Sequence, residues 1–524
     1  MSKNITLPIY FILLLFIWGC KNEPKHQTEE NAPSRPNIVF IMADDLGYGE
    51  LGSYGQNKIE TPNIDALADN GMLFTQAYSG SPVCAPSRCV LLTGMHTGNA
   101  FLRSNDEMDD RGDVWSFEDM YNDSSLEGQI PMPTSVTTVA EKLKEAGYST
   151  GAIGKWGLGG PDSVGHPNNQ GFDYFYGYLC QRIAHTYYPT HLWQNEERIL
   201  LKNELIDPHK AQLPKELDSL NPASYAQYHD QPDYAPELML NETLKFIEDQ
   251  THKPFFLYLP YTLPHVSLQA PKKWVDYYHE KFGDEPPYTS NSTIGSYVPV
   301  RYPRATYAAM ISYLDEQVGA VVKKLKEKGL YDNTLIIFTS DNGPSDASRV
   351  DTEFFNSAGI FNEQYGWGKA YVHEGGIRVP FIAAWEGKIK KGVKNEDMIA
   401  FWDIMPTLCD VAGITPDKDL DGISMLPSLL GKEQKQHDFL YWEFPSHGGQ
   451  QAVRMGKWKG LRMNLISDNS LDMELYNLEN DPREENNVAN EYPEIVKKIA
   501  DIMKKEHSVP EVEAFRISVL GDNQ

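Results

Sequence analysis

The sequence of 524 residues has few cysteines and a deficit of positive charge. Its five cysteines are an odd and sparse set, which excludes a fold held together by a disulfide framework. Lysine and arginine number 47 against 73 aspartate and glutamate residues, a formal net charge of −26, which disfavours nucleic acid and anionic membrane surfaces as partners. Hydrophobic residues make up 41% of the chain, enough for a packed globular core.

The chain also lacks a run of 18 uninterrupted apolar residues, the signature of a membrane-spanning helix. The apolar run from Ile5 to Trp18 follows Lys3 and is typical of an export signal. It ends in Gly19-Cys20, which resembles the bacterial lipobox, whose cysteine is lipidated; an ordinary signal peptide is the alternative. We therefore expect residues 1–19 to be a lipoprotein signal peptide and residues 20–36 a polar tether. The lipid on Cys20 would be the only membrane contact, in the periplasm or at the outer-membrane surface of a bacterium.

Short apolar runs alternate with helical patterns over most of the chain. The strand-like runs cover residues 37–42, 149–153, 255–259, 334–339 and 381–385, and the helical patterns cover residues 137–146, 235–249 and 307–328. This alternation predicts an α/β fold with a mostly parallel sheet covered by helices on both faces. After Gly431 short strand-like runs follow one another, with a helix near 493–505. We therefore expect a main domain over residues 37–431 and a smaller α+β domain over residues 432–524.

Carboxylate and amide side chains follow two of the predicted strands. Asp44 and Asp45 follow the first strand, and Asp341 and Asn342 follow the strand at 334–339. Because ligands bind beyond the carboxyl ends of parallel strands, we expect these four side chains to come together. Four oxygen donors suit a single hard cation, calcium or magnesium, rather than zinc. Ordinary turn chemistry is the alternative, because these residue types also terminate strands.

A third motif lies at Ser81-Pro-Val-Cys84-Ala-Pro86-Ser-Arg88, followed by a short apolar stretch and Thr93-Gly94. It resembles the signature of type I sulfatases, in which a cysteine followed by x-Pro-Ser-Arg is converted to formylglycine by a sulfatase-maturing enzyme. Cys84 takes that position, and Pro86 suits the first turn of a helix whose N-terminus favours an anion. A buried structural cysteine is the alternative for Cys84. The resemblance covers about residues 36 to 490 and implies the alkaline-phosphatase-like fold.

Further positions match the family one by one. Lys155 in Gly-Lys-Trp and Lys369 in Gly-Lys match the two lysines that contact sulfate, and His265 matches the histidine that faces the leaving oxygen. The resemblance implies that hydrated formylglycine attacks sulfur, that Arg88 and the two lysines neutralise the sulfuryl oxygens, and that His265 protonates the departing alcohol. The implied ligands of one ion, Ca²⁺ in preference to Mg²⁺, are Asp44, Asp45, residue 84, Asp341 and Asn342.

The chain departs from the family pattern directly after Lys155. The usual His-Leu-Gly, whose histidine assists sulfate release, is replaced by Gly157-Leu-Gly159. His185 and His373 are candidates for that role, and nothing in the sequence ranks them. We also expect His185 to bind substrate, because the polar and aromatic stretch from Gln181 to His191 is the predicted specificity region. Aromatic side chains that are candidates for stacking on sugars are Trp115, Tyr187, Tyr188, Trp193 and Trp274.

Together these features predict a sulfuric ester hydrolase that acts on a sulfated mono-, oligo- or polysaccharide. Two alternatives stay open. One is a metal-dependent phosphatase or phosphodiesterase of the same superfamily, although the histidine-poor ligand set disfavours it. The other is a catalytically silent lipoprotein that binds sulfated glycans, which the replacement at Gly157 suggests. The sequence does not indicate which sugar, or which of its hydroxyl groups, carries the sulfate.

Overall fold

A computed structural model describes Met1 and residues 35–522, except residues 109–110, 112–114, 251–252, 291–295, 363 and 365. From Arg35 onward the described chain belongs to one unit. Apart from Met1, the expected signal peptide lies outside the described residues, as do Cys20 and all but the last two residues of the expected tether. In the part of the chain that is described, no helix combines the length and the apolar character needed to cross a bilayer.

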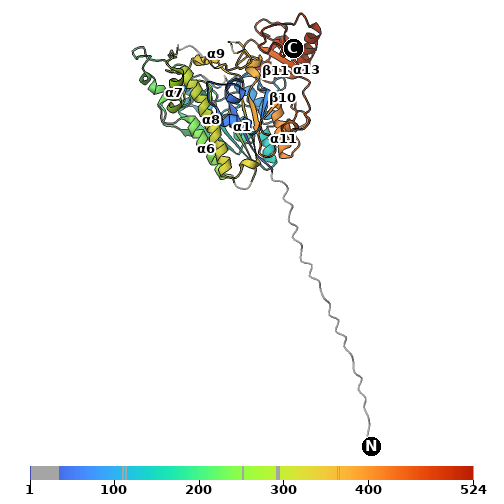
Figure 1. Ribbon diagram of the computed structural model, residues 1–524, viewed down its shortest axis with the longest axis horizontal. Helices are drawn as coiled ribbons and strands as arrows, with labels where there is room; N and C mark the ends of the chain where they lie inside the picture. Colours follow the sequence, from blue (N-terminus) through green and yellow to red (C-terminus); the bar gives the residue numbers. More distant parts are fainter. Residues whose placement is uncertain are drawn as a thin grey trace. The chain divides into compact units, whose positions relative to one another are not determined.

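A mixed sheet forms the centre of the fold (Figure 1). It has ten strands, in the order β10-β2-β9-β8-β1-β7-β3-β4-β5-β6. The adjacent strands β8, β1, β7, β3 and β4 are mutually parallel, and β9, β5 and β6 run antiparallel to their neighbours. The prediction of a mostly parallel sheet is confirmed. The strands are β1 (Asn37–Ala43), β2 (Met72–Tyr78), β3 (Ser149–Lys155), β4 (Tyr174–Tyr178), β5 (His191–Gln194), β6 (Glu197–Leu200), β7 (Phe255–Pro260), β8 (Thr334–Ser340), β9 (Phe381–Ala384) and β10 (Val393–Ala400).

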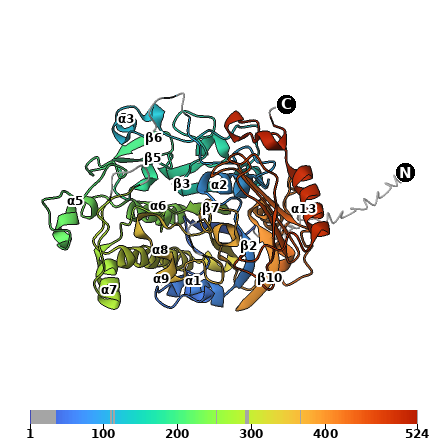
Figure 2. The same ribbon diagram turned by 90° about the horizontal axis from the view of Figure 1, so that it is seen from above.

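Helices cover both faces of this sheet, as predicted. On β1, Ile38, Phe40 and Met42 point to one face and Val39 and Ile41 to the other, because successive side chains of a strand alternate. The first face packs against α2 (Cys84–Thr93), α4 (Val139–Glu145) and α11 (Ile404–Ala412). The second packs against α1 (Pro62–Asp69), α6 (Ala235–Asp249) and α8 (Pro303–Glu327), and Figures 1 and 2 show α6 and α8 side by side.

The remaining helices are short or peripheral, apart from α13 near the end of the chain. They are α3 (Phe117–Asn122), α5 (Ala226–His229), α7 (Lys272–Phe282), α9 (Thr352–Phe355), α10 (Glu374–Ile377), α12 (Leu426–Leu429) and α13 (Pro493–Glu506).

A second, antiparallel sheet of four strands follows residue 431, in the order β11-β12-β13-β14. Its strands are β11 (Leu440–Phe444), β12 (Gln450–Met455), β13 (Trp458–Arg462) and β14 (Glu474–Asn477). Helix α13 packs on one face through Ile499 and Met503, whereas Trp442 and Leu461 on the other face join the core of the main sheet. The α+β character of this segment is confirmed, and the boundary at residue 431 stays a prediction.

Four parallel neighbours end at the same edge of the main sheet. Strand β1 ends at Ala43, β8 at Ser340, β7 at Pro260 and β3 at Lys155, and Ala43 pairs with Ser340 in the register of β1 and β8. Asp44, nearly 300 residues away from Asp341 in the chain, is therefore brought next to it. This edge is where the predicted site residues meet.

Candidate active site

Cys84 is the first residue of α2. The helix follows Val83, whose backbone is extended, and ends at Gly94, whose backbone is left-handed. Pro86 lies in the first turn, as predicted. The Cys84 side chain is buried, and its Sγ lies 3.3 Å from Oδ1 of Asp44. The N–H of the next residue, Ala85, donates to Oδ1 of Asn105 at 2.9 Å. The start of α2 therefore sits directly over the end of β1.

The four predicted oxygen ligands come together and are at most 2% exposed. The N–H of Asp45 donates to Oδ1 of Asp341 at 3.1 Å, and Nδ2 of Asn342 donates to Oδ1 of Asp45 at 2.8 Å. Asp45 adopts a φ of 63°, a left-handed conformation that is uncommon outside glycine and turns its carboxylate into the cluster. Residues from the ends of β1 and β8 thus form one buried acidic cluster, as the sequence predicts.

Three cationic side chains contact this acidic cluster. Nη2 of Arg88 lies 2.9 Å from Oδ2 of Asp341 and 3.2 Å from Oδ2 of Asp44. Nζ of Lys155 lies 2.7 Å from Oδ2 of Asp44. Nζ of Lys369 lies 2.8 Å from Oδ2 of Asp45. Three carboxylates therefore face three cations, so a divalent ion added to this pocket would give it a net positive charge.

Burial and these ion pairs shift the pKa values in the pocket. Burial alone would raise the pKa of Asp44, but Lys155, His265, Arg88 and Lys369 together hold it well below its ordinary value. Burial and the neighbouring Asp44 raise the pKa of the Cys84 thiol. A nucleophilic cysteine needs a lowered pKa, so the unmodified thiol is not set up to attack a substrate.

The donor set fits a single hard cation. Oδ1 of Asn342 is buried and has no hydrogen-bond partner among the described residues, so it is an acceptor that a cation would satisfy. One ligand atom from each of Asp44, Asp45, Cys84 and His265 lies within 4.8 Å of the others. Carboxylate and amide oxygens are the ligands that Ca²⁺ and Mg²⁺ prefer. The residues therefore suit the predicted ion.

His265 follows β7 and reaches the same pocket. Its Nε2 lies 3.6 Å from Oδ2 of Asp45, and its Nδ1 is hydrogen-bonded to the carbonyl of Val266. Burial and the nearby Lys369 lower the pKa of His265 to about 4. A neutral ring bonded to a carbonyl carries its proton on Nδ1, which leaves Nε2 as an acceptor until it gains a proton.

His185 stacks on His265, with ring centroids 5.1 Å apart and an interplanar angle of 12°. Its Nδ1 lies 2.8 Å from Nε2 of His209, whose own Nδ1 lies 2.8 Å from the carbonyl oxygen of Ser296. Sequence reasoning missed His209, because its contact with His185 depends on a long loop with no motif. His373 contacts Trp367, and none of its described contacts reaches Cys84.

A cavity of about 270 Å³ opens beside Lys369. Its lining includes Val83 and Asn105 beside the start of α2, Tyr297, and His447 from the C-terminal segment. A substrate bound in this cavity would reach the Cys84 pocket through Lys369.

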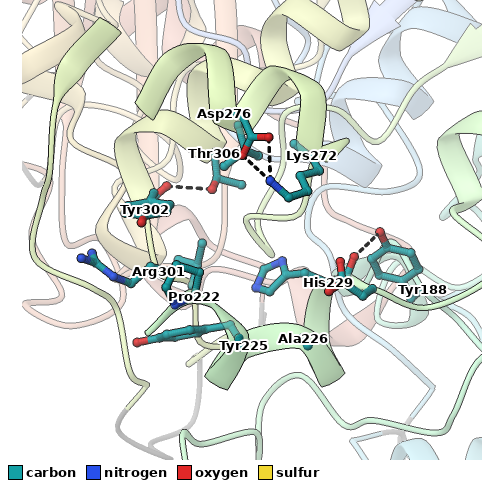
Figure 3. A pocket seen from close by; sticks show the side chains of 15 residues that line it. Tyr188, Pro222, Tyr225, Ala226, His229, Lys272, Asp276, Arg301, Tyr302 and Thr306 are labelled. Carbon is teal, nitrogen blue, oxygen red and sulfur yellow. Dashed lines mark hydrogen bonds and ion pairs between the residues drawn. The ribbon is translucent and has the colours of Figure 1, made fainter. Parts of the chain in front are cut away.

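A second cavity, of about 330 Å³, contains none of the predicted site residues except the aromatic Tyr188 (Figure 3). Its two cationic side chains are already paired, Lys272 with Asp276 and Arg301 with Asp284. Of the two cavities, the one beside Lys369 is the one that adjoins the charged pocket.

The chain matches the protein-family model described as sulfatase over residues 36–414. It belongs to the sulfatase family. Residues 363–509 also match the model described as N-sulphoglucosamine sulphohydrolase, C-terminal, which spans Lys369 and all four strands of the second sheet. The predicted type I sulfatase family and alkaline-phosphatase-like fold are confirmed.

Related proteins align with most of the length of this sulfatase. An N-acetylgalactosamine-6-O-sulfatase of Bacteroides thetaiotaomicron is 29% identical, covering 96% of this chain and 99% of that protein. An N-acetylgalactosamine-6-sulfatase of Canis lupus familiaris is 30% identical, covering 82% of this chain and 72% of that protein. The crystal structure of Ps i-CgsB in complex with k-i-k-neocarrahexaose has a TM-score of 0.70 and 27% sequence identity, covering 91% of this chain and 94% of that chain. The protein is an enzyme that hydrolyses sulfate esters.

The aromatic side chains expected to stack on sugars are mostly inside this sulfatase. Tyr187 and Trp193 are 0% and 6% exposed and belong to the hydrophobic core, so stacking of their rings on a sugar stays a prediction. Tyr188 is 8% exposed and lines the second cavity (Figure 3). Trp115 is exposed, with Arg182 over its ring, and Trp274 packs against Tyr278. A large ring buried in the core contributes mainly to packing.

Proposed function

We propose that this sulfatase removes sulfate from a sulfated carbohydrate by means of a formylglycine made from Cys84 and one Ca²⁺ ion. One observation carries the proposal. Cys84 begins a buried helix in contact with Asp44, inside a pocket where Arg88, Lys155 and Lys369 meet the carboxylates. A helix N-terminus and three cations together favour an anion such as a sulfate ester.

The ligands proposed for the ion are Asp44, Asp45, Asp341, Asn342 and residue 84. When bound, Ca²⁺ and the matured residue 84 would supply Lewis acidity and a hydroxyl of lowered pKa. The orphan Oδ1 of Asn342 supports this assignment, since a buried acceptor without a partner is costly. Mg²⁺ is the less favoured ion, because it holds its water ligands more tightly.

The chain's own cations would bind the ester and stabilise charge. Lys155 and Lys369 place their ammonium groups within 2.8 Å of the carboxylates assigned to the ion, so both border any anion bound there. Arg88 holds Asp44 and Asp341 in one arrangement by bridging them. Protonated at Nε2, His265 would donate that proton to the departing alcohol oxygen.

A carbohydrate suits this site for two reasons: a cavity opens beside Lys369, and His185 offers a hydrogen-bond acceptor for a hydroxyl group. The Ser296 carbonyl can only accept, so His209 donates from Nδ1 and accepts at Nε2 from Nδ1 of His185. Nε2 of a neutral His185 is therefore an acceptor for a hydroxyl group. The names of the relatives from Bacteroides and dog, and the oligosaccharide bound to Ps i-CgsB, support a sugar substrate.

We also propose that the enzyme is an exported bacterial lipoprotein, held in the periplasm or at the outer-membrane surface by lipid on Cys20. The apolar run ending in Gly19-Cys20 supports this location. The proposed partners are a sulfated mono-, oligo- or polysaccharide and a sulfatase-maturing enzyme, with no role for nucleic acid. A cell-fractionation experiment with the Cys20→Ala variant tests the anchor; the variant should leave the membrane fraction, and a variant that stays there would refute it.

The test of the activity is sulfate release by protein produced with and without a sulfatase-maturing enzyme. Ion chromatography would follow sulfate released from position-defined sulfated sugars, and mass spectrometry of the Cys84 peptide would show the conversion of thiol to aldehyde. We expect release only from converted protein. Cys84→Ala should be inactive, whereas Cys89→Ala, another buried cysteine of α2, should stay active. Equal activity of unconverted protein, or faster turnover of a phosphodiester than of every sulfated sugar, would refute the proposal.

A further inference from the structure

The space beside Gly157 is filled by the side chain of Gln181. Gly157 has a φ of 79°, and a Cβ built on it would lie 2.6 Å from Cγ and 3.2 Å from Oε1 of Gln181. A side chain at residue 157 is thus excluded while Gln181 keeps this position. The family pattern carries a histidine at residue 157, so here an amide from residue 181, shortly after β4, takes that space.

The orientation of the Gln181 amide follows from its neighbours. Oδ1 of Asn105 accepts the N–H of Ala85 at 2.9 Å and is therefore an acceptor. Nε2 of Gln181 lies 3.5 Å from the same oxygen, and the reverse orientation would bring two carbonyl oxygens together. The backbone N–H of Gln181 donates to Oε1 of Gln129 at 3.0 Å, which fixes the main chain. The Oε1 atom is thereby assigned.

Oε1 of Gln181 is a buried acceptor without a hydrogen-bond partner among the described residues, on a residue that is 5% exposed. Leaving such an atom unsatisfied is costly, so native proteins usually give it a donor. Its neighbour Asn105 contacts the residue after Cys84 and also lines the cavity beside Lys369. A donor for Oε1 is therefore to be sought in the active site.

We propose that Gln181 is a positioning residue whose Oε1 accepts a hydrogen bond from a hydroxyl group bound in the active site. That hydroxyl is carried either by residue 84 after its maturation or by the substrate next to the sulfate ester. An amide oxygen accepts a hydrogen bond but does not take up a proton near neutral pH, unlike imidazole. Gln181 therefore orients the hydroxyl without serving as a base. This inference rests on the proposed function.

The test compares Gln181→Leu, which removes the acceptor at similar size, with Gln181→Glu, which keeps one. The kcat and KM values would be measured on a sulfated monosaccharide and on 4-nitrophenyl sulfate, which has no hydroxyl group. A second readout is the rate at which an aminooxy probe labels the residue-84 aldehyde in the folded protein, followed by intact mass. We expect Gln181→Leu to lose about tenfold in kcat/KM, the equivalent of one hydrogen bond, and Gln181→Glu, which keeps the acceptor but sets a second oxygen against Oδ1 of Asn105, to recover only part of it.

The two arms identify the donor. Loss on both substrates with faster labelling assigns the hydroxyl to residue 84, whereas loss on the sugar alone with unchanged labelling assigns it to the substrate. Unchanged kinetics and unchanged labelling in a folded Gln181→Leu protein would overturn the inference. If converted wild-type protein releases no sulfate at all, the proposed function fails, and the labelling rates still report on Gln181.

Discussion

Lys155 and Lys369 make matching ion pairs but differ in burial, so replacing each by methionine should separate stability from activity. Nζ of Lys155 lies 2.7 Å from Asp44, with side chains 1% and 0% exposed. Nζ of Lys369 lies 2.8 Å from Asp45, with side chains 20% and 2% exposed. Both variants remove one positive charge next to the proposed sulfate position and leave a buried carboxylate, but the ammonium group lost from residue 369 is the more exposed of the two.

The expected magnitudes follow from that difference. Removing one partner of a buried pair lowers the free energy of unfolding by about 3–5 kcal/mol. Because Arg88 still contacts Asp44, the loss in Lys155→Met should be about 3 kcal/mol. In Lys369→Met, Asp45 keeps its hydrogen bond from Asn342 and water can reach the partly exposed position of residue 369, so the cost should be smaller, about 1–2 kcal/mol. Each variant should lose about 10²–10³-fold in kcat, because a positioned group that stabilises developing charge has that effect.

The assay combines initial rates of sulfate release with urea denaturation followed by tryptophan fluorescence. Lys391→Met is the matched control, since Lys391 pairs with Glu386 at 2.9 Å on the surface, with its side chain 50% exposed. This control should change neither quantity. The reasoning would be refuted if Lys369→Met lost as much stability as Lys155→Met, or if Lys369→Met kept more than about a tenth of the wild-type kcat.

Three further predictions follow. Removing divalent ions with EGTA should abolish sulfate release, and Ca²⁺ should restore it better than Mg²⁺; activity that survives chelation would contradict the ion site. Burial raises the pKa of Glu50 to about 7, above its unfolded value, so this group's contribution to stability is present below pH 4.5 and is lost as the pH rises through 7. Between pH 4.5 and 8 the free energy of unfolding of Glu50→Gln should therefore rise by about 3 kcal/mol relative to that of the wild type, as measured by urea denaturation. A difference that does not change with pH would disprove this. Nη1 of Arg103 lies 2.6 Å from Oε1 of Glu443 in a buried pair. In urea denaturation, Arg103→Met should therefore lower the free energy of unfolding by about 3–5 kcal/mol. A loss below about 1 kcal/mol would contradict a stabilising role for this pair.

The sequence predicts the acidic cluster because one rule of parallel sheets is enough to place it. Asp44 and Asp341 follow apolar strands, and neighbouring parallel strands end at the same edge. The edge strand β10 was missed, because residues 394–397 are four consecutive polar residues and only its last two residues are buried. Contacts such as His185 with His209, or Gln181 with Gly157, depend on how loops pack against one another. Periodicity carries no information about them.

His447 lies on the loop between β11 and β12 and lines the same cavity as Lys369. Cys84, the acidic cluster and both lysines all come from the chain before residue 370. Among the described residues that line this cavity, His447 is the one that comes from the C-terminal sheet, so its part of the wall is encoded separately from the groups proposed to act on the ester. Replacing residues 445–449 by those of a relative would change the lining of the cavity at His447 and leave the charged contacts of Cys84 in place. Selectivity in this enzyme is therefore open to engineering from its C-terminal sheet.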